Sequence, residues 1–144
     1  MKKLFLILTT ALLSLSVMAE ERQVTFEKLP SKAQKFITTH FSSLKISYVK
    51  YDSDIADRDY EVYFEGGTSV EFRRKGEWSK IDCGRGVAVP FAVLPEGVVG
   101  FLSTEHAGVD VVEAERDGRE YELVLSNGTE LTFDSNGRFK YYDN

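Results

Sequence analysis

The sequence predicts an α+β protein made of two tandem units, each a helix followed by a four-stranded antiparallel meander. Three observations lead to this fold class. The segment that begins at Leu29 has a second copy that begins at Leu94. Each copy opens with Leu-Pro and continues with apolar residues at helical spacing. Each copy then ends in short runs of β-branched and aromatic residues separated by turn signals.

The internal repeat sets the expected domain boundaries. At an offset of 65, Leu29-Pro30 matches Leu94-Pro95 and Phe36 matches Phe101. After four extra residues in the first copy, the offset becomes 61 and aligns Tyr60-Glu61 with Tyr121-Glu122, Gly67-Thr68 with Gly128-Thr129, and Phe72 with Phe133. We therefore expect a first repeat at residues 20–83, a linker at 84–93 and a second repeat at 94–144.

Residues 1–19 have the features of a secretory signal peptide. Lys2 and Lys3 precede an apolar run from Leu4 to Val17, and small residues lead to cleavage after Ala19. A membrane anchor is the competing reading, but the run is shorter than the roughly 20 residues that cross a bilayer. We expect a periplasmic or secreted protein with no membrane insertion after cleavage.

Charge and composition exclude several classes of function. The chain of 144 residues has a formal charge of −5, and removal of Lys2 and Lys3 makes it −7, so nucleic acid is not an expected partner. A single cysteine, Cys83, cannot close an internal disulfide and is expected to be a buried or half-buried structural thiol. His40 and His106 do not repeat, and no nucleophile elbow, phosphate loop or dinucleotide motif occurs. We expect no enzyme activity and no cofactor.

One amphipathic helix is expected at the start of each copy, because proline is tolerated in the first helical turn. The apolar positions are Ala33, Phe36, Ile37 and Phe41 in the first copy, and Val98, Phe101 and Leu102 in the second. Gly97 and Gly100 weaken the second helix by up to about 1 kcal/mol each relative to alanine. Tertiary packing must therefore stabilise it.

Four strands are expected after each helix. They lie at residues 44–51, 58–64, 68–73 and 77–81 in the first copy, and at 109–116, 119–125, 129–134 and 138–142 in the second. Loop length decides which side chains share a face, because successive residues of a strand point to opposite faces. Three-residue loops at 65–67 and 126–128 place Val62 and Val70 on one face with Leu123 and Leu131, toward the helices. The opposite face then carries Glu61, Tyr63, Ser69, Glu71, Arg73, Glu122, Val124, Glu130, Thr132 and Asp134.

The last strand of each copy leaves two orientations open. Two-residue turns at Lys75-Gly76 and Asn136-Gly137 point Trp78, Lys80, Phe139 and Tyr141 away from the helices, whereas three-residue turns bury them. We prefer the outward orientation because Asn-Gly is the strongest two-residue hairpin signal.

The order of these motifs resembles the PepSY-like proteins, also called β-lactamase-inhibitor-like. The resemblance rests on Leu-Pro before a helix, then Tyr-Glu, Gly-Thr, Phe and a glycine turn before an aromatic strand, in both copies. It implies that the two meanders join into one larger curved antiparallel sheet with the helices on its convex side. It also implies binding, and inhibition, of a secreted or periplasmic protein or peptide by the concave face. The disulfide-bonded β-lactamase inhibitors of this fold have cysteines that this chain lacks.

Seven residues are the candidate contacts with a protein partner. Aromatic side chains on an open sheet supply the large anchors that dominate interface energetics. Such side chains also stabilise a sheet as cross-strand partners, so both roles remain open. The candidates are Tyr63, Glu71, Arg73, Trp78, Lys80, Phe139 and Tyr141.

A calcium-responsive or small-ligand sensor is the alternative function. Asp52, Asp54, Asp57 and Asp59 bring four carboxylates into eight residues where the first copy has its insertion, and calcium prefers clustered oxygen ligands. The EF-hand pattern is not met, because Asp57 stands at the glycine position and Tyr63 at that of the final glutamate. A solvated acidic loop is the other reading.

Overall fold

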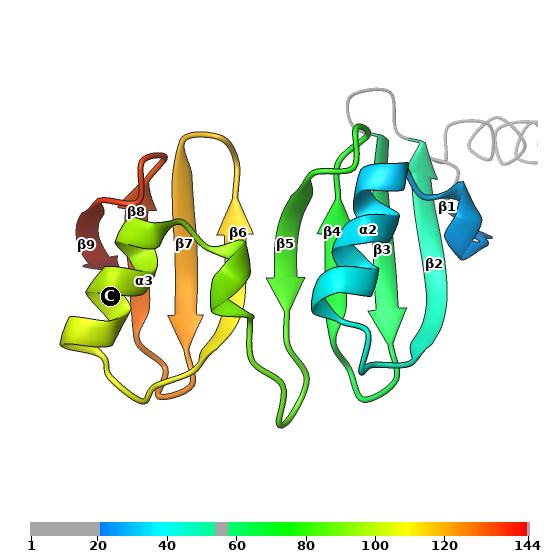
Figure 1. Cartoon of the computed structure of the whole chain (residues 1–144). Coiled ribbons are helices and arrows are strands. Elements are labelled where there is room, and N and C mark those ends of the chain that lie inside the picture. The colour runs from blue at the N-terminus through cyan, green and yellow to red at the C-terminus, as the bar shows by residue number, and fades with distance from the viewer. Residues whose placement is uncertain (1–20, 54–57, 144) are drawn as a thin grey trace, which may run out of the picture.

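The computed structural model describes residues 21–53 and 58–143. In these residues nine strands form one antiparallel sheet whose strand order is the order of the sequence (Figure 1). The strands are β1 (Glu21–Val24), β2 (Ile46–Ser53), β3 (Arg58–Phe64), β4 (Ser69–Phe72), β5 (Trp78–Asp82), β6 (Val111–Arg116), β7 (Glu120–Leu125), β8 (Glu130–Asp134) and β9 (Phe139–Asp143). Helix α2 (Ser31–His40) lies between β1 and β2, and helix α3 (Glu96–Glu105) lies between β5 and β6. Short 3-10 helices at Phe26–Lys28 and Phe91–Val93 precede them.

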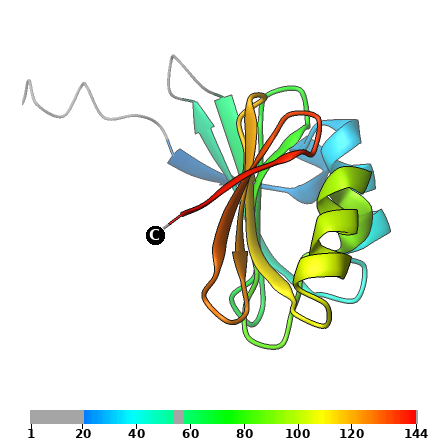
Figure 2. The same cartoon turned by 90° about the vertical axis from the view of Figure 1, so that its left-hand side faces the viewer.

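Both helices cover the same face of the sheet (Figure 2). The α+β class is confirmed, and the eight expected strands occur within about two residues of their predicted bounds. Strand β1 was not expected; it pairs antiparallel with β2 at the sheet edge, with Val24 opposite Val49. The predicted signal segment lies outside the described residues, and the tandem-repeat organisation stays a prediction.

The first and second groups of four strands are joined by β5 and β6. Ile81 pairs with Ala114, and both side chains are fully buried. This pairing makes one continuous sheet, as the family resemblance implied.

The hydrophobic core lies between the sheet and the two helices. Each helix buries two residues four positions apart, Ala33 and Ile37 in α2 and Val98 and Leu102 in α3. Strands β2 to β8 contribute the side chains that face the helices, as expected of a sheet with one covered face. They include Val49, Val62, Phe64, Val70, Phe72, Ile81, Val111, Ala114, Leu123, Leu125, Leu131 and Phe133.

Glycine turns press against the first turn of each helix. A Cβ at Gly97 would lie 2.6 Å from the carbonyl oxygen of Gly137, in the turn between β8 and β9. A Cβ at Gly76, in the turn between β4 and β5, would lie 3.0 Å from the Cβ atoms of Pro30 and Lys32 in the α2 segment. Gly97 is therefore required by close approach, which explains a glycine inside a helix.

The turns before β5 and β9 contain three residues, so the preferred two-residue turns are wrong. The Arg73 amide donates to the Glu77 carbonyl oxygen at 2.8 Å, and the Asp134 amide donates to that of Arg138 at 2.8 Å. Gly76 and Gly137 occupy the left-handed position with φ of 92° and 82°. In the second turn, Asp134 Oδ1 accepts from the amides of Asn136 and Arg138 at 2.9 Å, which favours this longer turn.

A β-bulge follows each of these turns. Phe72 pairs with Trp78 but Glu71 pairs with Lys80, which leaves Ser79 as the extra residue. Phe133 pairs with Phe139 and Thr132 with Tyr141, with Lys140 as the extra residue. A bulge reverses the alternation of side chains. The first residue of each strand therefore faces the helices, and the third faces away.

Candidate functional site

The sheet face opposite the helices carries the candidate site, and we call it the open face. The residues of the open face are those that alternate along each strand with the buried core residues. No helix of the described chain covers this face (Figure 2). In β2 to β5 the open face carries Tyr48, Lys50, Asp52, Asp59, Glu61, Tyr63, Ser69, Glu71, Lys80 and Asp82. In β6 to β9 it carries Glu113, Glu115, Glu120, Glu122, Val124, Glu130, Thr132, Asp134, Tyr141 and Asp143.

Four of the seven predicted contacts share the open face. Tyr63, Glu71 and Lys80 lie on neighbouring strands β3, β4 and β5, and Glu71 stands directly opposite Lys80. Tyr141 lies on β9 opposite Thr132, and its side chain is 46% exposed. These four residues remain candidates for partner contacts.

The preferred outward orientation of Trp78 and Phe139 is wrong. Trp78 is buried on the helix side, with its ring 6.5 Å from that of Phe36 in α2. Phe139 stacks on Phe101 of α3 at 4.4 Å. The three-residue turns place both aromatics beside core phenylalanines, and the bulges then return Lys80 and Tyr141 to the open face.

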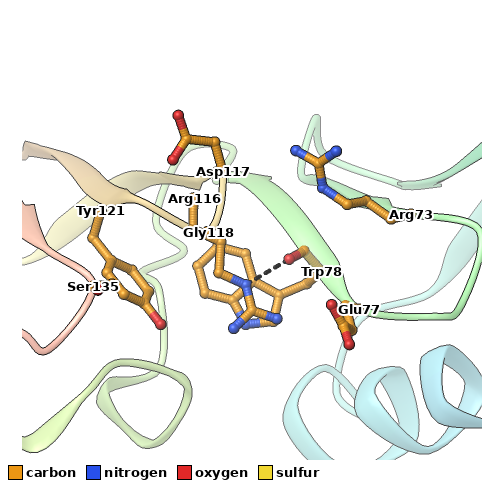
Figure 3. Close-up of a pocket in the computed structure, with 8 residues that line it drawn as sticks. All are labelled: Arg73, Glu77, Trp78, Arg116, Asp117, Gly118, Tyr121 and Ser135. Atoms are coloured by element: carbon orange, nitrogen blue, oxygen red, sulfur yellow. Dashed lines mark hydrogen bonds between the residues drawn. The ribbon is translucent and has the colours of Figure 1, made fainter. Parts of the chain in front are cut away.

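Arg73 is not among the paired strand residues of the open face, because β4 ends at Phe72. It follows the end of β4 and lines a cleft of about 360 Å³ with Trp78, Arg116 and Tyr121 (Figure 3). In this cleft Arg116 Nε donates to the Trp78 carbonyl oxygen at 2.7 Å, and its guanidinium lies 4.4 Å from the centre of the indole ring. The stacked pair holds β5 against β6 where the two groups of strands meet.

Carboxylates stand directly opposite one another across the open face. Five such pairs join neighbouring strands between β3 and β9: Glu61 with Glu71, Asp82 with Glu113, Glu115 with Glu122, Glu120 with Asp134, and Glu130 with Asp143. Like charges in this position are destabilising. The open face therefore has an arrangement that folding alone does not favour.

The pKa values of two of these carboxyl groups reflect that arrangement. Burial raises the pKa of Glu71 above its ordinary value, and the charges of Glu61 and Asp59 raise it further. Burial likewise raises the pKa of Glu122, with added repulsion from Glu115 and Asp143. Both effects favour the protonated, uncharged form.

Lysines offset only part of this negative charge. Lys80 Nζ lies 3.4 Å from Glu113 Oε1, and Lys50 Nζ lies 2.8 Å from Glu21 Oε2 at the β1 edge. Lys140 pairs with Glu120 at the opposite edge. Each of these lysines has a raised pKa, to which its paired glutamate contributes.

Tyrosines flank the acidic part of the open face. Tyr48 and Tyr63 stack with ring centres 4.5 Å apart on β2 and β3, and Tyr141 lies on β9. Burial and a hydrogen bond to Glu61 raise the pKa of Tyr63. Tyr63 thus remains a neutral hydrogen-bond donor at physiological pH.

The predicted calcium loop is only partly described. Asp54 and Asp57 lie outside the described residues, while Asp52 and Asp59 stand opposite each other on β2 and β3. Within residues 21–53 and 58–143, no group of three or more histidine, cysteine, aspartate or glutamate residues is placed to hold a metal ion.

Several acidic members of the open face were missed by sequence reasoning. Glu113, Glu115 and Asp82 meet only because β5 pairs with β6, and that pairing joins segments that the internal repeat treats separately. The alternation of Glu113 and Glu115 with Ala114 was a signal present in the sequence, since it marks one polar and one buried face.

Together the fold and the open face define a two-layer α+β protein with one sheet surface left to solvent. Residues 58–141 match the model of a family described as beta-lactamase-inhibitor-like, PepSY-like. The chain belongs to this PepSY-like family. None of the curated proteins matches it.

Solved structures from Bacteroides share the fold. A proposed periplasmic protein of the DUF2874 family from Bacteroides vulgatus is 35% identical, with a TM-score of 0.81, covering 87% of this chain and 98% of its own. A proposed calcium-regulated periplasmic protein from Bacteroides thetaiotaomicron is 37% identical, with a TM-score of 0.81 and coverage of 86% and 97%. A proposed periplasmic protein of unknown function from Bacteroides vulgatus is 33% identical, with a TM-score of 0.79 and coverage of 87% and 100%.

None of the helices in residues 21–53 and 58–143 combines the length and the apolar character needed to span a membrane.

Proposed function

We propose that the protein is an exported, non-enzymatic binding module that holds a periplasmic or secreted protein against its open face. The partner is inhibited if the open face covers the partner's active site or binding site. The observation that carries the proposal is the uncovered sheet surface, which presents Tyr63, Glu71 and Lys80 on neighbouring strands and Tyr141 near its other edge. A sheet face of this kind offers aromatic and charged anchors on a rigid support.

The comparisons support the location and the class. The similar structures from Bacteroides are described as periplasmic proteins, and the family description refers to inhibitors of a secreted enzyme. An apolar segment at residues 4–17 fits export.

Site-specific photo-crosslinking tests this proposal. The crosslinking amino acid p-benzoylphenylalanine replaces Tyr63 or Tyr141 in producing cells, and the crosslinked proteins are identified by mass spectrometry. The control position is Phe91, which is 40% exposed in the 3-10 helix ahead of α3. We expect the same partner to be crosslinked from positions 63 and 141 and not from 91. A partner crosslinked only from position 91 would overturn the choice of face.

We infer that the two helix-plus-meander segments are copies of one unit. Phe36 lies edge-on to Phe72 at 5.5 Å and 82°, and Phe101 lies edge-on to Phe133 at 5.5 Å and 83°. These pairs occupy matching positions of the proposed repeat. Phe36→Leu and Phe101→Leu should therefore lower the free energy of unfolding by similar amounts, measured by urea unfolding. Losses that differ severalfold would oppose equivalent packing.

A calcium-responsive role is the second candidate. It is favoured by the name of the Bacteroides thetaiotaomicron protein and by the position of Asp52 opposite Asp59 at the two ends of the acidic segment. Calorimetric titration of residues 20–144 with calcium tests it, with the Asp54→Asn/Asp57→Asn variant as a comparison. Heat and a thermal shift that this variant abolishes support the acidic loop as the site. No heat and no shift would remove this candidate.

A further inference from the structure

We infer that the open face receives a cationic polypeptide segment, rich in lysine and arginine, from the protein partner. This inference rests on the proposed function, since it names the chemistry of the partner at the same face. Two observations support this inference. The register of the sheet places carboxylates opposite carboxylates, and a hollow in the open face is lined by carboxylates.

The carboxylates form two rows that cross the strands. One row runs from Glu61 through Glu71, Lys80 and Glu115 to Glu122. The other runs from Asp82 through Glu113, Val124 and Glu130 to Asp143. Neighbouring strands lie about 4.8 Å apart, and alternate residues of a strand lie about 7 Å apart. Cationic side chains on an extended or helical segment have comparable spacings.

A hollow in the open face offers a place for a cationic head group. It has a volume of about 340 Å³ and is lined by Glu113, Glu115, Glu122, Glu130 and Asp143 together with backbone and apolar atoms of β7. Glu115, Glu122 and Glu130 are exposed. An ammonium or guanidinium group placed there would contact several carboxylates at once, and such charge-assisted hydrogen bonds are stronger than neutral ones.

The distribution of charge over the molecule points in the same direction. Four basic residues of the first half lie on the helix side and at its turns, Lys32 and Lys35 on α2 and Arg74 and Lys75 in the turn that packs against it. Lys50 and Lys80 lie on the open face, where carboxylates outnumber them. The open face is correspondingly acidic. This separation orients a cationic partner toward the open face before contact.

Other cationic or charged ligands fit the same surface less well. Nucleic acid would be repelled by the carboxylates. A single metal ion needs converging ligands, and no group of three metal-ligating residues is brought together in the described part of the chain. A peptide spreads its charges over the rows, and Tyr63 and Tyr141 add faces on which arginine can stack.

The inference is tested by fluorescence polarisation, in which synthetic peptides are titrated with the protein comprising residues 20–144. The probe is a labelled peptide of alternating lysine and serine, and its counterpart has glutamate at every lysine. The test variant is Glu115→Gln/Glu122→Gln. The control is Glu96→Gln/Glu105→Gln, which makes the same charge change at exposed positions of α3. The test variant removes like-charge repulsion, so circular dichroism should show it folded.

We expect the lysine peptide to bind and the glutamate peptide not to bind. The test variant should bind at least fivefold more weakly, while the control stays within twofold of the unchanged protein. Equal losses in both variants would show that only net charge matters and would overturn the inference, as would the absence of binding at low salt. Displacement of the peptide by calcium below millimolar concentration would also overturn it in favour of a metal site.

The crosslinked partner separates this inference from the proposed function. When a partner is crosslinked from positions 63 and 141, its affinity is measured for the same two variants. A partner that binds the Glu115→Gln/Glu122→Gln variant with unchanged affinity leaves the proposed function standing and overturns the cationic chemistry. A lysine peptide that binds this face while the partner is crosslinked only from position 91 overturns the proposed function itself.

Discussion

Phe139 of β9 lies face to face with Phe101 of α3, with ring centres 4.4 Å apart and planes inclined by 9°. This contact ties the last strand to the second helix, and Phe139 also packs against Phe133 at 5.8 Å. Two residues further on, Tyr141 points to the opposite face. The bulge at Lys140 therefore gives neighbouring aromatics on one strand different roles.

Alanine substitutions at Phe139 and Tyr141 should lower the stability of the protein by different amounts. Phe139→Ala removes a partly buried ring that packs against the core and should lower the free energy of unfolding by about 2 to 3 kcal/mol. Tyr141→Ala removes an exposed ring and should change it by less than about 1 kcal/mol. Urea unfolding followed by circular dichroism measures both. A larger loss for Tyr141→Ala would contradict the bulged register.

Alanine at the two glycines of α3 should have opposite effects. Gly97→Ala places a methyl group against the Gly137 carbonyl and should destabilise the protein by about 1 to 3 kcal/mol. Gly100 has open space around it, so Gly100→Ala should stabilise the helix by up to about 1 kcal/mol. Thermal unfolding of both variants tests the contact, and stabilisation by both would show that the turn does not press on the helix.

The carboxyl groups with raised pKa values should make stability depend on pH. Above the ordinary glutamate pKa, folded Glu71 and Glu122 keep protons that the unfolded chain has released. Their contribution to stability is therefore fully present below the unfolded pKa and is lost as pH rises through the folded values. The Glu71→Gln/Glu122→Gln variant should lose less stability over this range.

Urea unfolding between pH 4 and pH 7 measures this difference. The gain of the variant over the unchanged protein should grow as pH rises. Glu105→Gln, an exposed change at the end of α3, serves as the comparison and should show no such growth. A gain that is constant with pH would argue against raised pKa values at these two positions.

Cys83 should react slowly as a nucleophile. Its side chain is half-buried, and burial together with the nearby charge of Asp82 raises the pKa of the thiol to about 11. Because the thiolate is the reactive form, alkylation by iodoacetamide at pH 8 should be on the order of 100-fold slower than that of free cysteine. Mass spectrometry follows the reaction, and the unfolded chain in guanidinium should react at the ordinary rate. Fast alkylation of Cys83 in the folded protein would contradict a raised pKa of its thiol.

Much of the fold was predictable because it depends on local patterns. Leu-Pro at residues 29 and 94, helical spacing of apolar residues, and turn glycines led to both helices and eight strands. The three-residue loops at 65–67 and 126–128 are confirmed by the pairing of Phe64 with Thr68 and of Leu125 with Thr129.

The parts that sequence reasoning missed depend on tertiary context. Trp78 and Phe139 were assigned to the wrong face because the turns before them contain three residues instead of two. The bulges at Ser79 and Lys140, which return Lys80 and Tyr141 to the open face, have no local signature. Strand β1 is short and polar and forms because β2 offers it an edge. The acidic rows of the open face required the pairing of β5 with β6, which joins distant segments of the chain.

The order of strands in the sheet also affects how the chain can fold. Within residues 21–53 and 58–143, each strand pairs only with the strands next to it in sequence, and the sheet contains no crossover. Most contacts between strands are therefore short-range in sequence, which lowers contact order and favours rapid folding. Pairing of β1 to β5 requires no residue beyond Asp82, so this part of the sheet can assemble before the C-terminal strands have been synthesised.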